Sequence, residues 1–293
     1  FNVVTCSRDN VAAVGDELIS NPTVRGVSFT GSTARGGQVA AKAGGLLKKC
    51  CVELGGKDAL IVLRDADIEH AVNAATFGAF MHQGQICMSV ERVIVHKDVA
   101  NEFTEKFVAN AKKLKVGNPR EMANCIGPII NQKQLDKIRD QVDDAVAKGA
   151  KVLCGGKHKG LFFEPTVLSN ITRDMKVMRE ETFGPIAPVI TVGSVDEAIE
   201  IANDSEYGLS AGIMTRNEER GLSVARRLNT GMAHINDSSV NDEPHVPFGG
   251  VRSSGLGRHG GRAGIDQFTE MRWITLERGG RHYPPPFLMN PGH

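Results

Sequence analysis

The sequence predicts an α/β protein built in three layers, with helices on both sides of largely parallel sheets. Strand-like apolar segments alternate with helix-like segments along almost all of the 293 residues, which is the pattern of such folds. The length and the 41% of hydrophobic residues suffice for one large core or two ordinary ones. No internal repeat or low-complexity segment interrupts the sequence.

The first part of the chain predicts strands and helices in turn. A strand-like run at 2–5 is followed by a helix at 10–22, a strand at 24–32, a helix at 33–44 and short strands at 50–56 and 58–63. Asp65 or Asp67 can cap the next helix, because its side-chain oxygen can accept a hydrogen bond from a free N–H of the first turn. The apolar face of that helix recurs at helical spacing, at Ile68, Ala71, Val72 and Ala75.

The rest of the chain repeats this alternation. A strand at 92–96 precedes two helices, whose apolar faces contain Val99, Phe103, Phe107 and Leu114 and then Leu135, Ile138, Val142 and Val146. Gly149 is expected to end the second of them. Further strands are expected at 151–155, 162–168, 187–192, 210–215 and 231–236, with helices at 194–205 and 217–229. A Gly-rich run at 247–264 then breaks the periodicity, and residues 268–280 predict an extended arm before a Pro-rich tail.

Composition limits the class of partner. Thirty-five basic and 34 acidic side chains leave a formal charge of +1, so no overall field favours nucleic acid, an anionic membrane or a polyanionic substrate. A small-molecule partner is therefore expected. The six cysteines lack CxxC spacing and the histidines are scattered, so we expect neither a metal site nor a disulfide framework.

The chain carries no signal for export or for insertion into a membrane. No apolar run approaches the ~20 residues of a membrane span, and no charged-then-apolar segment opens the sequence. A cytoplasmic, reducing compartment is the expectation. Because the sequence begins at Phe1 without Met and within a strand-like run, we also expect it to be part of a longer protein.

Cys87 differs from the other cysteines in its surroundings. It lies in HQGQICMSV, residues 82–90, after a Gln-Gly-Gln turn and among small polar residues. A free cysteine is more often a buried apolar residue than a nucleophile. Here, neighbouring backbone N–H groups could lower its pKa and stabilise an oxyanion. This segment alone leaves both interpretations open.

Three further segments contain candidate binding residues. Gly31 and Gly36 lie where a strand gives way to a helix, and small residues there let a phosphate or ribose approach the backbone and the positive end of the helix; they also suit an ordinary turn. Glu53 ends a strand in CVELGGKD and could face a site or water. In REETFGPIAPV, Glu181 could accept hydrogen bonds from ligand hydroxyls and Phe183 could offer a flat face, or both could belong to a turn.

Taken in order, the segments FTGSTARGG, VELGGKDA, GQICMS, EETFGPI and PFGGVRSSGLGR resemble the NAD(P)-dependent aldehyde dehydrogenase superfamily. Two of them match the family's active-site signatures, and the spacing between Glu53 and Cys87 fits that family. The resemblance covers essentially the whole chain, which corresponds to the C-terminal part of a member. It implies the family's three-layer fold, with part of a Rossmann-like cofactor domain and a complete α/β catalytic domain.

The resemblance also implies domain boundaries and an assembly. It assigns 1–53 to the C-terminal part of the cofactor domain, 54–253 to the catalytic domain, 254–268 to a return to the cofactor domain, and 269–293 to an oligomerisation arm and tail. The arm around Trp273–Leu276 resembles the strand with which members extend a neighbour's sheet. A homodimer or homotetramer is therefore expected.

The family's reaction transfers to two residues of this chain. Cys87 would attack the aldehyde carbonyl as a thiolate to give a thiohemiacetal, and its own N–H would help to hold the oxyanion. After hydride transfer to the nicotinamide has left a thioester, Glu53 would act as general base toward the hydrolytic water. The positions that match cofactor contacts are Gly31 and Ser32 beside the pyrophosphate, Leu54 and Phe183 near the nicotinamide, and Glu181 at its ribose.

The sequence departs from the family pattern in places. Cys6 stands near the position where members usually have glycine, and Arg252 stands where most have lysine, which keeps the positive charge. The family's oxyanion-holding asparagine and ribose-binding lysine would precede Phe1, so apolar surface and strand edges are expected to lie uncovered. The residues that distinguish NAD from NADP would precede it too; NAD is the favoured cofactor.

MHQGQICMSVERVIV and the Gly-rich run with the arm most resemble the branch that oxidises aromatic aldehydes such as benzaldehyde, salicylaldehyde or vanillin. A pocket flanked by Phe80, Met81, Met88 and Phe248 would suit an aromatic ring, although such residues are more often found in a core. Two alternatives to this enzyme stay open. The chain could be a non-catalytic fragment or structural homolog, or its thiol could hydrolyse esters or thioesters without NAD.

Overall fold

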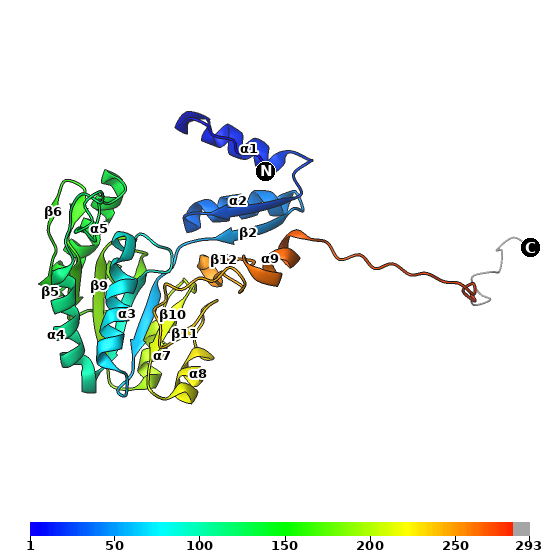
Figure 1. Ribbon diagram of the computed structural model, residues 1–293. Coiled ribbons are helices and arrows are strands. Elements are labelled where there is room, and N and C mark those ends of the chain that lie inside the picture. The colour runs from blue at the N-terminus through cyan, green and yellow to red at the C-terminus, as the bar shows by residue number, and fades with distance from the viewer. Residues whose placement is uncertain (284–293) are drawn as a thin grey trace, which may run out of the picture.

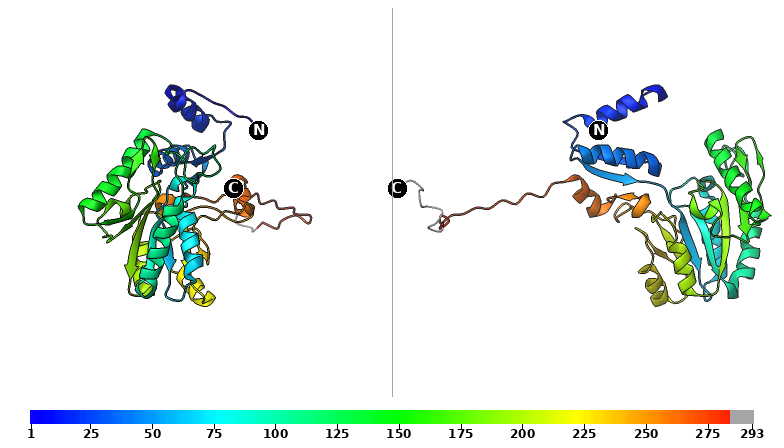
Figure 2. Two further views of the ribbon diagram at one scale, coloured as in Figure 1. Left: turned by 60° about the vertical axis from the view of Figure 1, so that its left-hand side comes forward. Right: turned by 180° about the vertical axis from the view of Figure 1, so that it is seen from behind.

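Two sheets joined by crossings of the chain form the molecule (Figures 1 and 2). The computed structural model describes residues 1–283. The larger sheet has seven strands in the order β11-β10-β3-β4-β9-β8-β5, parallel except that β5 runs antiparallel to β8. Its strands are β3 (Asp58–Val62), β4 (Val90–His96), β5 (Lys151–Cys154), β8 (Thr166–Ser169), β9 (Ile186–Val192), β10 (Ala211–Met214) and β11 (His234–Ile235). The predicted α/β class with largely parallel strands is confirmed.

Helices cover both faces of the larger sheet. They are α3 (Ile68–Phe80), α4 (Lys97–Lys113), α5 (Gln132–Ala147), α6 (Lys176–Arg179), α7 (Val195–Asn203) and α8 (Glu218–Ala225). One apolar cluster packs α3 and α4 against one face of the sheet. On the opposite face, a second cluster packs α7 and α8 against the sheet, and a third packs α5 and α6. Because strand side chains alternate, Leu60 of β3 packs in the first cluster and Ile61 in the second. This burial on both sides explains why the strand reads as an uninterrupted apolar run.

The smaller sheet has the strand order β1-β2-β12. Its strands are β1 (Gly26–Thr30), β2 (Lys49–Glu53) and β12 (Gly255–Leu256), with β1 parallel and β12 antiparallel to β2. The helices α1 (Val11–Ser20), α2 (Thr33–Gly45) and α9 (Gly261–Phe268) accompany it (Figure 1). Since α1 buries no residue, β1 is an edge strand and Leu47 is 93% exposed, the uncovered surface expected here is present.

Short elements complete the described chain: the 3-10 helices η1 (Arg8–Asn10), η2 (Met81–Gly84) and η3 (Arg252–Ser254), and a hairpin of β6 (His158–Lys159) and β7 (Phe162–Phe163). Asp67 caps α3 by accepting a hydrogen bond from the His70 N–H, as predicted for one of two aspartates. Gly149 follows α5 with a φ of +97°, a left-handed conformation that suits glycine.

Two sequence expectations are wrong. The apolar run at 2–5 forms no strand: residues 1–7 have no regular structure, and their exposed backbone finds no neighbouring strand. The run at 162–168 is not one strand but two, β7 and β8, because Pro165 lies between them and cannot donate a ladder hydrogen bond. The C-terminal arm leaves the body as an exposed chain without helix or strand through Tyr283 (Figure 1), and the Pro-rich tail lies outside the described residues.

The chain crosses between the sheets at Leu54–Lys57 and returns through η3. The two crossings are joined to each other, since the Leu54 N–H donates to the Ser254 carbonyl at 3.0 Å. The Ser254 hydroxyl also accepts the Gly208 N–H at 2.9 Å, which ties the return to the loop before β10. These bonds fix the end of β2 relative to the larger sheet.

Phe80 tests the packing of α3 against α4. Its ring is 1% exposed and stacks on Phe107 with centroids 5.8 Å apart, so Phe80→Ala should cost about 3–5 kcal/mol of unfolding free energy. Phe77→Ala is the matched control, because Phe77 lies on the same helix and is 48% exposed. Urea denaturation measures both. Equal losses in the two variants would contradict this packing.

Candidate active site

Glu53 is held at the point where β2 ends. It pairs in register with Thr30 of β1, and its carbonyl accepts the Gly31 N–H at 3.0 Å. The side chain is 4% exposed, and its Oε1 has no hydrogen-bond partner among the described residues. An unpaired buried carboxylate oxygen is costly in a site that serves only packing. Glu53 is therefore suited to accept a proton or a hydrogen bond from a molecule that enters.

Cys87 lies in the turn between η2 and β4. Three residues in succession before it, His82, Gln83 and Gly84, have left-handed backbones with φ values of +48°, +58° and +67°. A Cβ on Gly84 would lie 2.2 Å from the Gly184 carbonyl oxygen, so only glycine fits there. The turn is thus pressed against the loop before β9, and it leaves the Cys87 side chain half-buried.

Glu53 and Cys87 lie close enough to affect each other's titration. Burial raises the pKa of Glu53, and a hydrogen bond with Cys87 opposes this rise. Burial also raises the pKa of Cys87, and the negative charge of Glu53 raises it further. Cys87 therefore rests as a thiol at neutral pH, beside a carboxylate that is a stronger base than an exposed glutamate.

The crossing segment passes directly over the Cys87 turn. A Cβ on Gly56 would lie 2.6 Å from the Cys87 carbonyl oxygen, so the close approach requires glycine. None of the hydrogen bonds within residues 1–283 uses the Cys87 N–H. An N–H without a partner, next to the thiol, can donate to an oxyanion that forms there.

The junction of β1 and α2 has the features of an anion-binding helix start. Ser32 is the N-cap, with an extended backbone and no side-chain capping bond, and the first turn contains no acidic residue. Leu54 packs against this turn: a Cβ on Gly36 would lie 2.1 Å from Leu54 Cδ2. Gly31, Ser32 and Leu54 are thus brought together, and the free N–H groups of α2 suit a pyrophosphate.

Glu181 faces the crossing segment from the other side. Its Oε1 accepts the Gly56 N–H at 3.2 Å, and a Cβ on Gly55 would lie 2.6 Å from the same oxygen. Burial, followed by the charge of Glu91, raises the pKa of Glu181 to about 7. Phe183 lies two residues further with a φ of +52°, an uncommon backbone for an aromatic residue. Its conformation is held by hydrogen bonds from neighbouring side chains.

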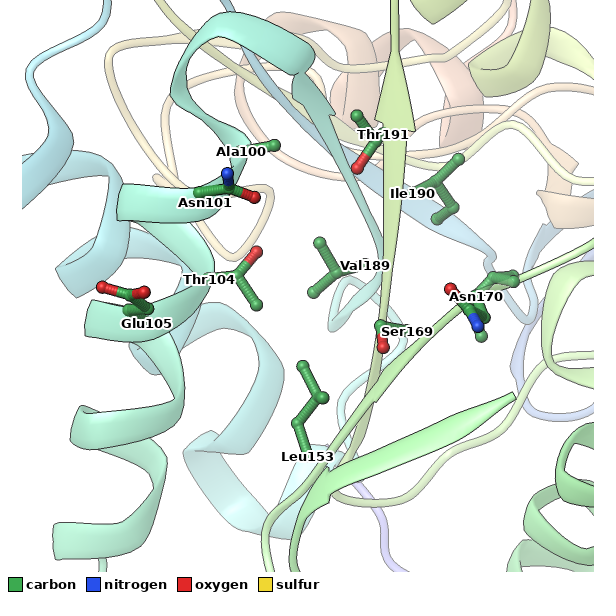
Figure 3. A pocket seen from close by; sticks show the side chains of 11 residues that line it. Ala100, Asn101, Thr104, Glu105, Leu153, Ser169, Asn170, Val189, Ile190 and Thr191 are labelled. Carbon is green, nitrogen blue, oxygen red and sulfur yellow. The ribbon is translucent and has the colours of Figure 1, made fainter. Parts of the chain in front are cut away.

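The proposed pocket residues do not share one environment. Phe80 is 1% exposed and packs in the core between α3 and α4. Met88 is also buried, next to Cys87, while Met81 is 38% exposed and Phe248 is half-buried. A separate cavity of about 470 Å³ lies between α4 and the strands β8 and β9 (Figure 3), and none of the predicted site residues lines it.

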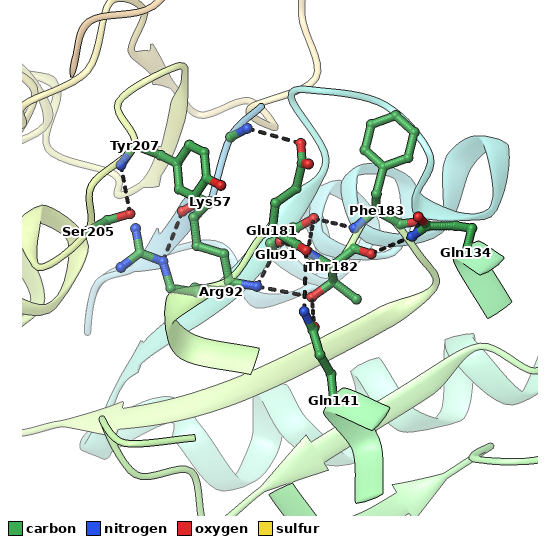
Figure 4. Close-up of polar contacts among 11 residues, drawn as sticks. Lys57, Glu91, Arg92, Gln134, Gln141, Glu181, Thr182, Phe183, Ser205 and Tyr207 are labelled. Carbon is green, nitrogen blue, oxygen red and sulfur yellow. Dashed lines mark hydrogen bonds and ion pairs between the residues drawn. The ribbon is translucent and has the colours of Figure 1, made fainter. Parts of the chain in front are cut away.

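A buried ion pair behind the site was not predicted. Lys57 Nζ lies 2.7 Å from Glu91 Oε2, and both side chains are at most 4% exposed (Figure 4). Arg92, equally buried, donates to the Lys57 carbonyl at 2.9 Å. The sequence held a signal for this cluster, because Glu91 and Arg92 interrupt the apolar strand VERVIVH. Charged residues in a strand that is buried along its whole length need partners.

Within residues 1–283, no group of three or more His, Cys, Asp or Glu side chains is arranged to hold a metal ion. In the same part of the chain, no helix has the length and apolar character needed to cross a membrane.

The sequence of residues 1–274 matches the model of the aldehyde dehydrogenase family. This chain belongs to that family. The fold brings Glu53, at the end of β2 in the smaller sheet, close to Cys87, in the turn before β4 of the larger sheet.

The relatives refine the place of the chain within the family. It is 47% identical over 274 residues to a benzaldehyde dehydrogenase [NAD(+)] of Pseudomonas putida, covering 93% of this chain and 56% of that protein. It is 45% identical to a vanillin dehydrogenase of Pseudomonas fluorescens, covering 97% and 59%. A crystal structure of a salicylaldehyde dehydrogenase from Pseudomonas putida G7, complexed with salicylaldehyde, superposes with a TM-score of 0.92 at 46% identity, covering 95% and 58%. The resemblance to the aromatic branch is confirmed, and the chain spans less than two thirds of these relatives.

The electrostatic coupling of Cys87 to Glu53 is measurable without substrate. In Glu53→Gln the carboxylate charge is gone, so the pKa of Cys87 should fall and its alkylation by iodoacetamide near neutral pH should accelerate, by roughly tenfold for each unit of the fall. Peptide mass spectrometry resolves this rate from that of the exposed Cys125, the internal control. Slower alkylation of Cys87 in the variant would show that Glu53 activates the resting thiol instead.

Proposed function

We propose that the protein containing this chain is an NAD(P)-dependent aldehyde dehydrogenase that oxidises an aromatic aldehyde to the carboxylic acid. The observation that carries the proposal is the coupling of Cys87 to Glu53 across the crossing segment. A thiol beside a buried base, with an unused N–H at the same residue, is the arrangement that acyl chemistry on a carbonyl requires.

Cys87 and Glu53 divide the work between them. Cys87 loses its proton to solvent, and its sulfur, as the thiolate, forms a bond to the aldehyde carbon while the Cys87 N–H donates to the resulting oxyanion. The nicotinamide, when bound, supplies the acceptor for the hydride that leaves this carbon. Glu53 then takes a proton from the water that attacks the thioester, whose carbon–sulfur bond breaks to release the acid and the thiol.

The cofactor would be held by residues from three segments. The free N–H groups of the α2 start, with Gly31 and Ser32, suit the pyrophosphate, while Leu54 and Phe183 flank the nicotinamide. Glu181 suits a ribose, because a carboxylate accepts hydrogen bonds from both hydroxyls of a diol. NAD is the favoured cofactor; a relative whose name specifies NAD(+) supports that choice.

The aromatic substrate rests on the relatives, which are named for benzaldehyde, vanillin and salicylaldehyde. We assign Met81, Met88 and Phe248 to the pocket wall, with Met88 directly after the nucleophile. Domain boundaries after 53 and after 253 are supported by the two crossings between the sheets. An assembly into dimers or tetramers is supported by the exposed arm, in which Trp273 is 92% exposed.

NADH formation from benzaldehyde and NAD tests this function in the full-length protein, expressed from the whole reading frame that contains this sequence. Cys87→Ala should abolish it, because the proposed thioester forms on the Cys87 sulfur. Cys125→Ala, at an exposed cysteine, is the control and should keep the wild-type rate. Retained NADH formation in Cys87→Ala would disprove the nucleophile. If the wild type binds no NAD but hydrolyses an activated ester, the alternative that the Cys87 thiol hydrolyses esters or thioesters would be favoured.

A further inference from the structure

The carboxylate of Glu91 is buried behind the loop that presents Glu181 (Figure 4). Both of its oxygens accept the Thr182 N–H, at 2.9 and 2.7 Å, and Oε1 also accepts the Phe183 N–H at 2.8 Å. Oε2 accepts from Lys57 Nζ at 2.7 Å. One side chain of β4 thus binds two successive N–H groups of the loop and one buried cation of the crossing segment.

The other polar groups of the loop are held from α5. Gln134 Nε2 donates to the carbonyls of Thr182 and Phe183 at 2.8 and 2.9 Å. Gln141 donates to the Glu181 carbonyl at 3.3 Å and accepts the Thr182 hydroxyl at 2.7 Å. Glu91 therefore binds the N–H groups of the loop from β4, and the two glutamines bind its carbonyls from α5. These opposed hydrogen bonds fix the orientation of the loop backbone. The left-handed backbone of Phe183 is kept within it.

We propose that Glu91 is a positioning residue for cofactor binding: with Lys57 as its counter-ion, it holds the loop 181–183 so that the Glu181 carboxylate meets the ribose diol of the bound nucleotide. The inference rests on the proposed function, because it takes Glu181 to be a ribose ligand. Glu91 itself touches neither substrate nor cofactor in this account and acts through the loop.

The charges around Glu181 add a second consequence. Glu91 raises the pKa of Glu181, while Lys137 of α5, the Gly56 N–H and Lys57 lower it. Burial raises the pKa of Tyr207 and of Asp58, and the negative charge of Glu181 raises both further. The carboxylate form accepts more hydrogen bonds than the acid. Cofactor affinity should therefore fall as the pH drops through about 7, and Glu91 and Lys57 should move that midpoint in opposite directions.

Calorimetric titration of the full-length protein with NAD, across the neutral pH range, tests the inference. In Glu91→Gln, NAD should bind roughly tenfold more weakly at high pH, because hydrogen bonds to a charged acceptor are lost. Its midpoint should move to lower pH, since Lys57 is left without its counter-ion. In Lys57→Met the midpoint should move to higher pH. Midpoints that stay unchanged, or that move in the same direction, would overturn the proposal.

The matched controls are Glu102→Gln and Lys106→Met. These residues form an ion pair of 2.8 Å on the exposed face of α4, so the same two exchanges should leave NAD binding unchanged. A single variant with one unpaired buried charge can fail to fold. The double variant Lys57→Met/Glu91→Gln removes both charges, and it should fold, bind NAD more weakly and keep a midpoint near that of the wild type. Wild-type affinity in the double variant would overturn the proposal.

The outcomes separate this inference from the proposed function. A wild type that forms NADH from aldehyde, together with variants that bind NAD as the wild type does, overturns the inference alone. A wild type that binds NAD but oxidises no aldehyde overturns the proposed function, while the shifts in affinity still decide the role of Glu91. A wild type that binds no NAD overturns both.

Discussion

The passage of the chain from the small sheet to the large one, at Glu53–Lys57, is the constraint on which the candidate site depends. The segment must run so close to the Cys87 turn and to the loop before β9 that Gly55 and Gly56 leave no space for a side chain. Its first residue is thereby fixed beside the thiol, and its last reaches into the larger sheet to pair with Glu91. This one stretch of backbone thus carries Glu53 and passes beside both the Cys87 turn and the Glu181 carboxylate.

Several charged side chains are buried in this region. Taking a carboxylate or an ammonium out of water is costly, and the structure meets this cost by pairing Lys57 with Glu91 and by giving Arg92 three carbonyl acceptors. Glu53 has no such partner, and burial raises its pKa together with that of Cys87. The charges behind the site are thus paired or hydrogen-bonded, whereas Glu53 has a carboxylate oxygen without a partner among the described residues.

Much of the fold could be predicted from the sequence, because the spacing of apolar residues and the positions of glycines indicate where helices and strands lie and end. The apolar faces of α3, α4 and α5 and the end of β2 at Glu53 follow from spacing and from glycine positions. The run at 2–5 misled, since strand propensity without a neighbouring strand forms no ladder. The surroundings of Phe80 could not be predicted either, because an aromatic residue near a candidate nucleophile has the same local pattern whether it packs in a core or lines a pocket; here it packs between α3 and α4. The local sequence likewise did not distinguish a nucleophilic Cys87 from a buried apolar one. The Lys57–Glu91 pair could not be predicted, because it joins positions far apart in the chain.

The central claim is that Cys87 carries the acyl group and Glu53 releases it. It is tested most directly by intact-protein mass spectrometry of full-length Glu53→Gln mixed with NAD and benzaldehyde. We expect a mass increase of one benzoyl group, located on the Cys87 peptide and absent when NAD is omitted, because the variant forms the thioester but hydrolyses it slowly. A variant that turns over at the wild-type rate without accumulating this adduct, or that carries it on another residue, would contradict the account.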